Sequence, residues 1–521
     1  MRNKLGLSQE KIDRARELAA GIVLPVQEYI HGHTTVTVER ATLRCLGADG
    51  VDGEGTPVPN LAVDSLGPEF AHGAARYYVN AILRRGLTPE QLNDAIVGGL
   101  DISAIDLVDF EHIRRKAVEL VGAFAGRVAD NVAQRNAKLE EFEGASEPPM
   151  LYLIVATGNI HEDVKQAAAA AQQGADVIAV IRSTAQSLMD YVPYGATTEG
   201  FGGTYATQEN FRIMRQALDA VAEGQRRYVR LVNYCSGLCM PEIAVMGALE
   251  RLDMMLNDSM YGILFRDINM YRTFVDQHFS RMVNALADII INTGEDNYLT
   301  TSDAYEKAYA VLASQLINER FAYNTGLTPR LMGLGHAFQM DPRTRNGLLY
   351  ELAQAQMARE IFPEHPLKYM PPTKFMTGDI FTGYTMNALF NFVSKATGQS
   401  IHLLGMLTEA LHTPHIQDRY LAVQSAKYVM NNMADFQDEV QFRPDGIIVN
   451  RAREVLDKAI EFLAEVNKIG LFDAIERGLF ADVKRPRSGG KGLEGVAEKA
   501  PDYWNPVAQL LAEKLGLPVQ P

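Results

Sequence analysis

The two ends of the chain show the spacing of amphipathic helices, with apolar residues three or four positions apart. Near the start, one helical face would be lined by Ile12, Ala15, Ala19 and Ile22. Residues 88–91 (TPEQ) predict a helix start, because threonine caps a helix, proline suits its first position and glutamine its third. A long charged helix is predicted over residues 110–141. We therefore interpret residues 1–145 as a mainly helical N-terminal region, and residues 441–521 as a helical C-terminal region with a glycine-rich loop.

Between these ends, short and continuously apolar runs alternate with helical stretches. The predicted strands cover residues 151–156, 177–181, 229–233, 261–265, 288–292, 330–334, 367–370 and 401–404. Runs without polar alternation are typical of parallel strands that are buried on both faces. About eight strand–helix alternations predict an α/β fold, a (β/α)8 TIM barrel over residues 150–440 with helical additions at both ends. A doubly wound open sheet is the alternative.

Composition narrows the function classes. The chain has 521 residues, of which 47% are hydrophobic and 22% charged, as in ordinary globular proteins. Disordered, collagen-like and coiled-coil chains are thereby excluded. The formal net charge of −14 argues against nucleic acid as the main partner, because a polyanion binder needs a basic face.

Cysteine usage and hydropathy predict a cytoplasmic location. The three cysteines, Cys45, Cys235 and Cys239, are too few for a disulfide framework and suit a reducing compartment. No apolar run reaches the length of about 18 residues that a membrane span requires. The first residues are charged and contain no apolar core of a signal peptide.

Polar residues follow nearly every predicted strand, and barrel active sites form at those strand ends. Arg182, Ser187 and Ser236 have the composition of a phosphate site, since arginine offers a planar fork and serine adds hydrogen bonds. Equally open is that Arg182 pairs with a carboxylate while the serines cap helices. Lys368 and Glu409 also fall at this rim.

Several short motifs do not predict a site. His31-Gly-His33 could bind a metal, but no cysteine or carboxylate lies at ligand spacing, so no metal site is predicted. The pair Cys235 and Cys239 has no second pair of cysteines to complete a zinc site. The sequence has neither GxSxG nor HExxH, so nothing indicates a hydrolase.

Long segments resemble the α subunits of the lysine 5,6-aminomutase family. They are residues 33–40 (HTTVTVER), 46–52 (LGADGVD), 194–212 (YGATTEGFGGTYATQENFR), 233–242 (NYCSGLCMPE) and 489–495 (GGKGLEG). The resemblance covers nearly the whole chain. It implies a barrel that carries most of the pocket for pyridoxal 5′-phosphate (PLP) and substrate. It also implies a β subunit whose Rossmann-like domain holds adenosylcobalamin, in an α2β2 assembly.

The resemblance also implies roles for individual residues. Arg182 and Ser187 match ligands of the PLP phosphate, and Ser236 matches a serine that contacts the ring nitrogen or the phosphate. Tyr261 matches a tyrosine against the PLP ring, and with Asp296 it is expected to take part in catalysis. Substrate-pocket roles are implied for Asp296, Lys368 and Glu409. The reaction implied moves the terminal amino group of D-lysine or L-β-lysine from carbon 6 to carbon 5 by a radical mechanism, in lysine degradation.

Cobalamin is expected on the partner, because base-off binding uses D-x-H-x-x-G. The nearest string here, Asp276-Gln-His278, lacks the glycine and lies in a helical pattern. The resemblance also implies that the lysine forming the resting Schiff base with PLP belongs to the β subunit, so this chain alone is expected to bind PLP weakly and noncovalently and to be inactive. Other possibilities are an enzyme similar to ornithine aminomutase, a cobalamin lyase, an aldolase that uses Lys368, or a non-catalytic scaffold subunit.

Overall fold

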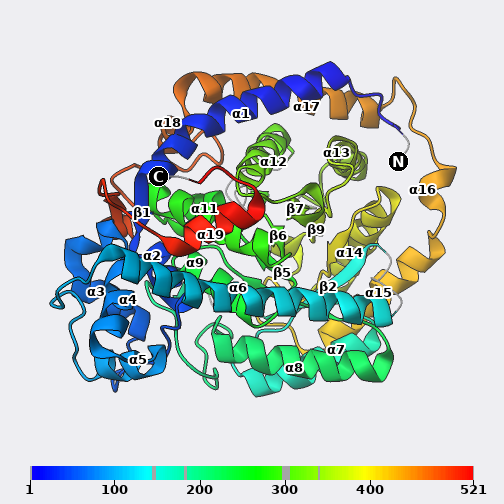
Figure 1. The fold of residues 1–521 in the computed structure, drawn as a ribbon. Coiled ribbons are helices and arrows are strands. Elements are labelled where there is room, and N and C mark those ends of the chain that lie inside the picture. The colour runs from blue at the N-terminus through cyan, green and yellow to red at the C-terminus, as the bar shows by residue number, and fades with distance from the viewer. Residues whose placement is uncertain (1–2, 143–147, 181–184, 296–304, 338–340, 520–521) are drawn as a thin grey trace.

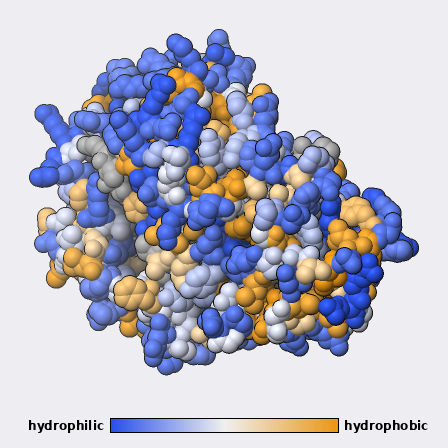
Figure 2. Space-filling view, turned by 90° about the vertical axis from the view of Figure 1, so that its left-hand side faces the viewer, coloured by the Kyte–Doolittle hydropathy of each residue, from blue (hydrophilic) through white to orange (hydrophobic). Residues whose placement is uncertain are grey.

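The computed structural model describes residues 3–142, 148–180, 185–295, 305–337 and 341–519. Figure 1 shows a central ring of strands surrounded by helices, with the N-terminal elements α2 to α5 gathered at one side. Within these described residues, every helix is too short or too polar to cross a bilayer. The face shown in Figure 2 mixes hydrophilic and hydrophobic residues, and the hydrophobic ones gather mainly toward its lower right.

Nine short parallel strands form the ring. They are β2 (Met150–Ile154), β3 (Val177–Val180), β4 (Arg230–Tyr234), β5 (Met254–Leu256), β6 (Ile290–Asn292), β7 (Met332–Gly333), β8 (Gly335–Ala337), β9 (Lys368–Met370) and β10 (Ile401–Leu403). Their order is β7-β6-β5-β4-β3-β2-β10-β9-β8, and every neighbouring pair is parallel. Only Leu334 separates β7 from β8, so the two ends of the order meet. The predicted eight-stranded barrel is confirmed, with one strand broken in two.

The strand predicted over residues 261–265 is wrong. Those residues lie in helix α10 (Ser259–Arg266), and the barrel strand at this place is β5, which precedes it. A short apolar run fits a buried helix as well as a strand. The deciding feature is Asp258, whose side chain accepts a hydrogen bond from the Met260 N–H (3.1 Å) and caps the helix.

Helices cover the outside of the barrel. They are α7 (Ile160–Gln173), α8 (Gln208–Gln225), α9 (Met240–Leu249), α10, α11 (Met270–Leu286), α12 (Ala308–Tyr323), α13 (Gly347–Ile361), α14 (Ile380–Ala396), α15 (Ile416–Asn432) and the short α16 (Phe436–Glu439). The barrel interior is filled by its own cluster, which includes Met150, Tyr152, Val177, Val232 and Ile401. Both strand faces are therefore buried, as the apolar runs predict.

The N-terminal region consists of α1 (Gln9–Gly32), α2 (Val36–Cys45), α3 (Val58–Leu66), α4 (Ala74–Arg85), α5 (Pro89–Val97) and α6 (Phe110–Glu141). Helix α5 begins with the predicted capping box of Thr88 and Gln91. The C-terminal region contains α17 (Ile447–Ile469), α18 (Leu471–Arg477) and α19 (Pro506–Leu515).

The two terminal regions are joined to each other. Strand β1 (His33–Thr35) pairs antiparallel with β11 (Val496–Glu498), and α1 packs along α17 (Figure 1). The division into residues 1–145, 150–440 and 441–521 stays an interpretation of the sequence.

Candidate active site at the barrel rim

Ser236 lies just beyond β4 and links the ends of two strands. Its hydroxyl donates to the Leu256 carbonyl (3.3 Å) and accepts from the Asp258 N–H (2.9 Å). The side chain is fully buried. A serine hydroxyl has one proton and two lone pairs, so one lone pair remains for a ligand that donates a hydrogen bond.

Ser187 lies in a short 3₁₀ helix, Ala185–Leu188, beyond β3. Its backbone carbonyl accepts from the Leu238 N–H (3.0 Å), which ties it to the loop after β4. The neighbouring Gln186 amide bonds both backbone groups of Ala206, at 2.7 and 2.9 Å. The segment that carries Ser187 is therefore fixed on two sides.

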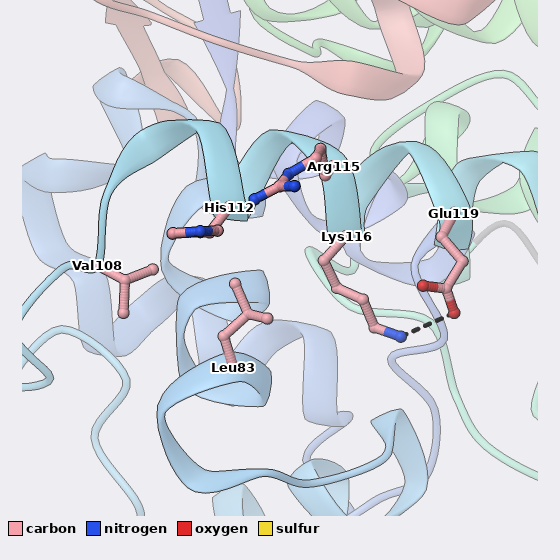
Figure 3. A pocket seen from close by; sticks show the side chains of 6 residues that line it. All are labelled: Leu83, Val108, His112, Arg115, Lys116 and Glu119. Atoms are coloured by element: carbon pink, nitrogen blue, oxygen red, sulfur yellow. Dashed lines mark hydrogen bonds and ion pairs between the residues drawn. The ribbon is translucent and has the colours of Figure 1, made fainter.

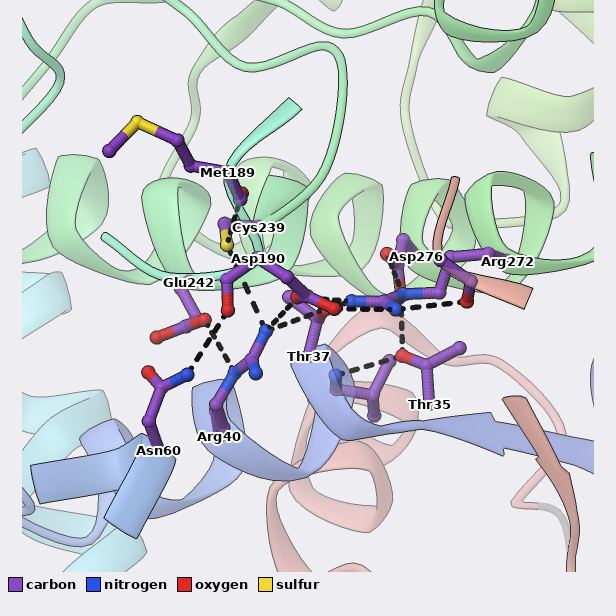
Figure 4. A network of polar contacts seen from close by, with 12 residues as sticks. Thr35, Thr37, Arg40, Asn60, Met189, Asp190, Cys239, Glu242, Arg272 and Asp276 are labelled. Carbon is purple, nitrogen blue, oxygen red and sulfur yellow. Dashed lines mark hydrogen bonds and ion pairs between the residues drawn. The ribbon is translucent and has the colours of Figure 1, made fainter. Parts of the chain in front are cut away.

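A buried ionic network holds the end of the same segment (Figure 4). Asp190 accepts from Arg272 (Nη2–Oδ1, 2.8 Å) and from Arg40, which also donates to Glu242 (2.9 Å). Arg272 in turn donates to Asp276 (3.0 Å). Burial opposes ionisation of Asp190, but the two guanidinium groups outweigh it and hold the pKa of this carboxyl well below its usual range.

The network joins four parts of the fold. Arg40 lies on α2, Glu242 on α9, and Arg272 and Asp276 lie on α11. Asp190 lies three residues beyond Ser187 in the chain. The N-terminal region therefore fixes the loop that follows β3.

Tyr261 lies on α10 with its ring buried among aromatic and cationic groups. The Tyr234 ring meets it edge-on, with centroids 5.5 Å apart, and Phe265 lies at 5.2 Å. Arg266 donates to the Tyr261 hydroxyl (3.0 Å). Although the predicted strand is wrong, the residue still lies just beyond a strand end, after β5.

Lys368 is the first residue of β9, and its side chain is buried. Its ammonium lies 5.3 Å from the centroid of the Tyr152 ring, which belongs to the barrel interior. A cation over an aromatic face gains electrostatic stabilisation. The lysine therefore places positive charge inside the barrel.

Glu409 lies in the loop after β10. One carboxylate oxygen accepts from the Met406 N–H (3.2 Å), and no cation among the described residues forms an ion pair with it. Burial raises the pKa of Glu409 to about 7, although contacts with Thr373 and the Met406 backbone oppose the shift. This carboxyl can therefore gain or lose a proton near neutral pH.

Two polar residues of this region were not predicted as site residues. Asn292 ends β6, is fully buried, and neither its amide nitrogen nor its oxygen has a hydrogen-bond partner among the described residues. Ile290, two positions earlier, packs on the barrel interior, so Asn292 points the same way. Its sequence signal is a polar residue at the end of an apolar strand.

Glu295 is the second polar residue of this region that was not predicted as a site residue. Both of its carboxylate oxygens accept hydrogen bonds, from Thr293 (2.5 Å), Gly335 (3.0 Å) and Asn318 (3.0 Å). Burial, and then the nearby Asp258 carboxylate, raise the pKa of Glu295 above its usual range. The sequence feature that could have identified Glu295 is an acidic residue just after a predicted strand.

The remaining two predicted site residues, Arg182 and Asp296, lie outside the described residues. Ser187, Ser236 and Tyr261 follow the neighbouring strands β3, β4 and β5 in the chain. Lys368 begins β9, and Glu409 lies in the loop that follows the adjacent strand β10. The described groups thus include serine hydroxyls and an aromatic ring on one arc, and a cation and an acid on another.

Comparison with known proteins identifies the family of the chain that carries this rim. The family model described as the D-lysine 5,6-aminomutase TIM-barrel domain of the α subunit matches residues 5–510. The chain belongs to this family. It is 58% identical to the lysine 5,6-aminomutase α subunit of Acetoanaerobium sticklandii, over 98% of this chain and 99% of that one. The α subunit from Fusobacterium nucleatum is 56% identical, over 98% and 99%.

A more distant relative is the D-ornithine 4,5-aminomutase subunit β of Acetoanaerobium sticklandii. It is 29% identical over 69% of this chain and 50% of its own length. Aminomutases are isomerases. Membership of the lysine 5,6-aminomutase α-subunit family therefore makes this chain one subunit of a cofactor-dependent isomerase with a partner subunit.

Proposed function

We propose that this chain is the barrel subunit of an enzyme that moves the terminal amino group of D-lysine, or of L-β-lysine, from carbon 6 to carbon 5. The observation that carries the proposal is the match to lysine 5,6-aminomutase α subunits along essentially the whole chain. The barrel rim supports it with groups suited to a phosphorylated cofactor and to a diamino acid.

PLP fits the arc of the rim after β3, β4 and β5. Ser187 would contribute to the phosphate site, together with Arg182. The free lone pair of Ser236 suits the protonated ring nitrogen of PLP better than the phosphate, because phosphate oxygens offer no proton at neutral pH. The Tyr261 ring would lie against the cofactor ring, with its hydroxyl held by Arg266. The Asn292 amide, which has no partner among the residues that the structure describes, offers a further donor and acceptor.

The cofactors supply the chemistry when bound: PLP holds the migrating amino group, and adenosylcobalamin provides the radical that removes hydrogen. The residues of this chain bind, orient and exclude water. Lys368 suits the substrate carboxylate or the phenolate oxygen of PLP, and Glu409 suits an ammonium group. With its pKa near 7, Glu409 would release a proton as a cation approaches. Asp296 is proposed for the same pocket and for catalysis.

The partner is proposed to be a β subunit with a Rossmann-like cobalamin domain, in an α2β2 assembly. Large exposed hydrophobic side chains follow β3, β9 and β10, at the same rim: Tyr194, Phe201, Ile380, Phe381 and Leu411. Exposed apolar groups of this kind mark interaction surfaces.

Cobalamin is proposed to bind the partner and not this chain. In this chain, Asp276 of the Asp276-Gln-His278 string lies within helix α11 and is bound to Arg272, so the string does not form a cobalamin-binding loop. A cytoplasmic location is proposed on the basis of the three free cysteines, all buried.

The test is reconstitution with the candidate β subunit. Both chains are mixed with PLP and adenosylcobalamin, D-lysine is added, and 2,5-diaminohexanoate is measured. The proposal requires product only when both chains and both cofactors are present. A folded, cobalamin-loaded complex that leaves D-lysine and L-β-lysine unchanged but converts D-ornithine would move the assignment to the ornithine enzymes.

A further inference from the structure

A cavity of about 440 Å³ lies outside the barrel, between the two terminal regions and the barrel helices. Its walls come from α1, α11, α12, α19 and the segment after β11. It is more enclosed than the hollow shown in Figure 3, where Lys116 is already paired with Glu119 (2.8 Å) on the surface of α6. None of the residues assigned to the barrel rim lines it.

Two short motifs that predict no site meet in this cavity. His31 and His33 come from α1 and β1, and His278 comes from α11. The rings of His31 and His278 lie edge to face, with centroids 5.9 Å apart. The Gln27 amide nitrogen lies 2.7 Å from His31 Nε2 and 3.5 Å from His278 Nδ1. No group of three metal-ligating side chains occurs among the described residues, so the geometry does not favour a metal.

Positive charge in the cavity has no carboxylate partner. Lys499 donates to the His31 carbonyl (2.9 Å) and lies over the Tyr503 ring (4.8 Å), but forms no ion pair with any described residue. Arg320, on α12, is an exposed residue at the edge of the cavity, and its guanidinium group has no hydrogen bond or ion pair with a described residue either. No Asp or Glu is found among the described residues that line the cavity.

The charge of Glu39 acts on Lys499, but the two form no ion pair among the described residues. Glu39 lies behind the cavity wall, where its oxygens accept from Thr34 (2.7 Å), Tyr503 (2.8 Å) and the Ala74 N–H (2.8 Å). Burial lowers the pKa of Lys499, and Glu39 only opposes this shift. Burial and then the charge of Lys499 also lower the pKa of His31, and the charge of Glu28 opposes this shift. A bound anion would relieve these penalties.

Part of the remaining lining is apolar, with Ile30, Val275, Phe279 and Met282 on two walls and Ala512 on a third, and uncharged polar side chains such as Asn324, Asn505 and Gln509 make up the rest. An enclosed apolar pocket with a few convergent polar groups is the usual form of a small-molecule site. From the cavity, its unpaired cations and this lining, we propose that the cavity binds a small carboxylate with an apolar body. The carboxylate is held by Lys499 and Arg320, and the apolar part packs between α11 and α19. This site is independent of the aminomutase reaction.

The chain contains a direct reporter of this site. Trp504 is its only tryptophan and lines the cavity. The test is to titrate the full chain, without PLP or adenosylcobalamin, with 3-phenylpropionate while tryptophan fluorescence is recorded. A saturable change is expected with the acid. The neutral 3-phenylpropionamide and the cationic 3-phenylpropylamine have the same body and should bind much more weakly.

Variants locate the anion. Lys499→Gln should weaken binding by about tenfold or more, because a charge-assisted hydrogen bond is lost, and Lys499→Arg should retain most of the affinity. Arg320→Gln is the second variant, since this exposed side chain can change without disturbing the fold. The matched control is Arg76→Gln. Arg76 lines a hollow that Trp504 also borders, and there it is already paired with Asp502 (2.7 Å).

Three results would overturn the proposal. The first is equal binding of the amide and the acid, which would mean that only apolar contacts matter. The second is unchanged affinity in both Lys499→Gln and Arg320→Gln. The third is a loss in Arg76→Gln as large as that in Lys499→Gln, which would place the anion in the other hollow. Circular dichroism melting curves establish that each variant is folded.

Discussion

Asp190 and Glu409 are acids on loops of the same barrel rim, yet their surroundings are opposite. Asp190 lies between the guanidinium groups of Arg40 and Arg272, which keep it ionised. Glu409 is half-buried with no cation bonded to it among the described residues, and its pKa is raised to about 7. Asp190 is therefore neutralised by arginines of this chain, whereas Glu409 is available to bind a cationic group of a ligand.

The difference separates structural from ligand-binding groups. A buried ion pair holds elements together, and removal of one partner is costly because the other charge is left uncompensated. A buried polar group without a partner costs stability in the free protein, so its retention points to a ligand that completes it. Asn292, whose amide has no partner among the described residues, belongs with Glu409 in this respect.

The largest expected effect is at the centre of the network. Arg272→Met leaves Asp276 and Asp190 without their shared guanidinium and should lower the free energy of unfolding by about 3–5 kcal/mol. Urea denaturation at pH 7 measures it. A change below about 1 kcal/mol would show that the network is not structural.

Asp190→Asn should lower the free energy of unfolding less, by about 2 kcal/mol, because the side chain is about a third exposed. It should also weaken PLP binding more than lysine binding, since it loosens the loop that carries Ser187. Absorbance titration with PLP and calorimetry with D-lysine give the two affinities. Asp502→Asn serves as the control, because Asp502 is also paired with an arginine, Arg76, but is more exposed than Asp190. Equal losses of both affinities in Asp190→Asn would count against the positioning role.

Glu409→Gln tests the other side of the comparison through pH. The folded pKa, about 7, lies above the unfolded value of about 4.3. The folded state therefore binds the proton more tightly, and stability falls as pH rises from about 4 to 7. Between pH 5 and 8 the wild type should lose about 2 kcal/mol more than the variant. Parallel stability curves would mean that Glu409 is not perturbed.

The smallest effect on stability is expected for Asn292→Leu. Replacing an unpartnered buried amide by an apolar group of similar size should change the free energy of unfolding by about 1 kcal/mol or less. Affinity for PLP or D-lysine should nevertheless fall. A large destabilisation with unchanged ligand affinity would make Asn292 a structural residue.

Sequence patterns sufficed for the barrel because its strands are buried on both faces and read as apolar runs. The fourth strand was misplaced because the cap at Asp258, not apolarity, distinguishes helix α10 from a strand. The resemblance supplied the site residues. Ser187, Ser236 and Glu409 follow barrel strands and Lys368 begins one, whereas Tyr261 lies in helix α10 and not in the predicted strand. Asn292 and the Asp190 network depend on contacts between segments far apart in the chain, which no local pattern reveals.

Under the proposed function, Glu409 at the barrel rim receives the ammonium group of the substrate. Calorimetry of D-lysine binding to the assembled enzyme at pH 7, in two buffers of different ionisation enthalpy, counts the protons released. If the ammonium meets Glu409, the wild type should release about half a proton more than Glu409→Gln, because a group with a pKa near 7 is about half protonated there. Equal proton release from both enzymes would contradict the account and place the substrate's ammonium group elsewhere.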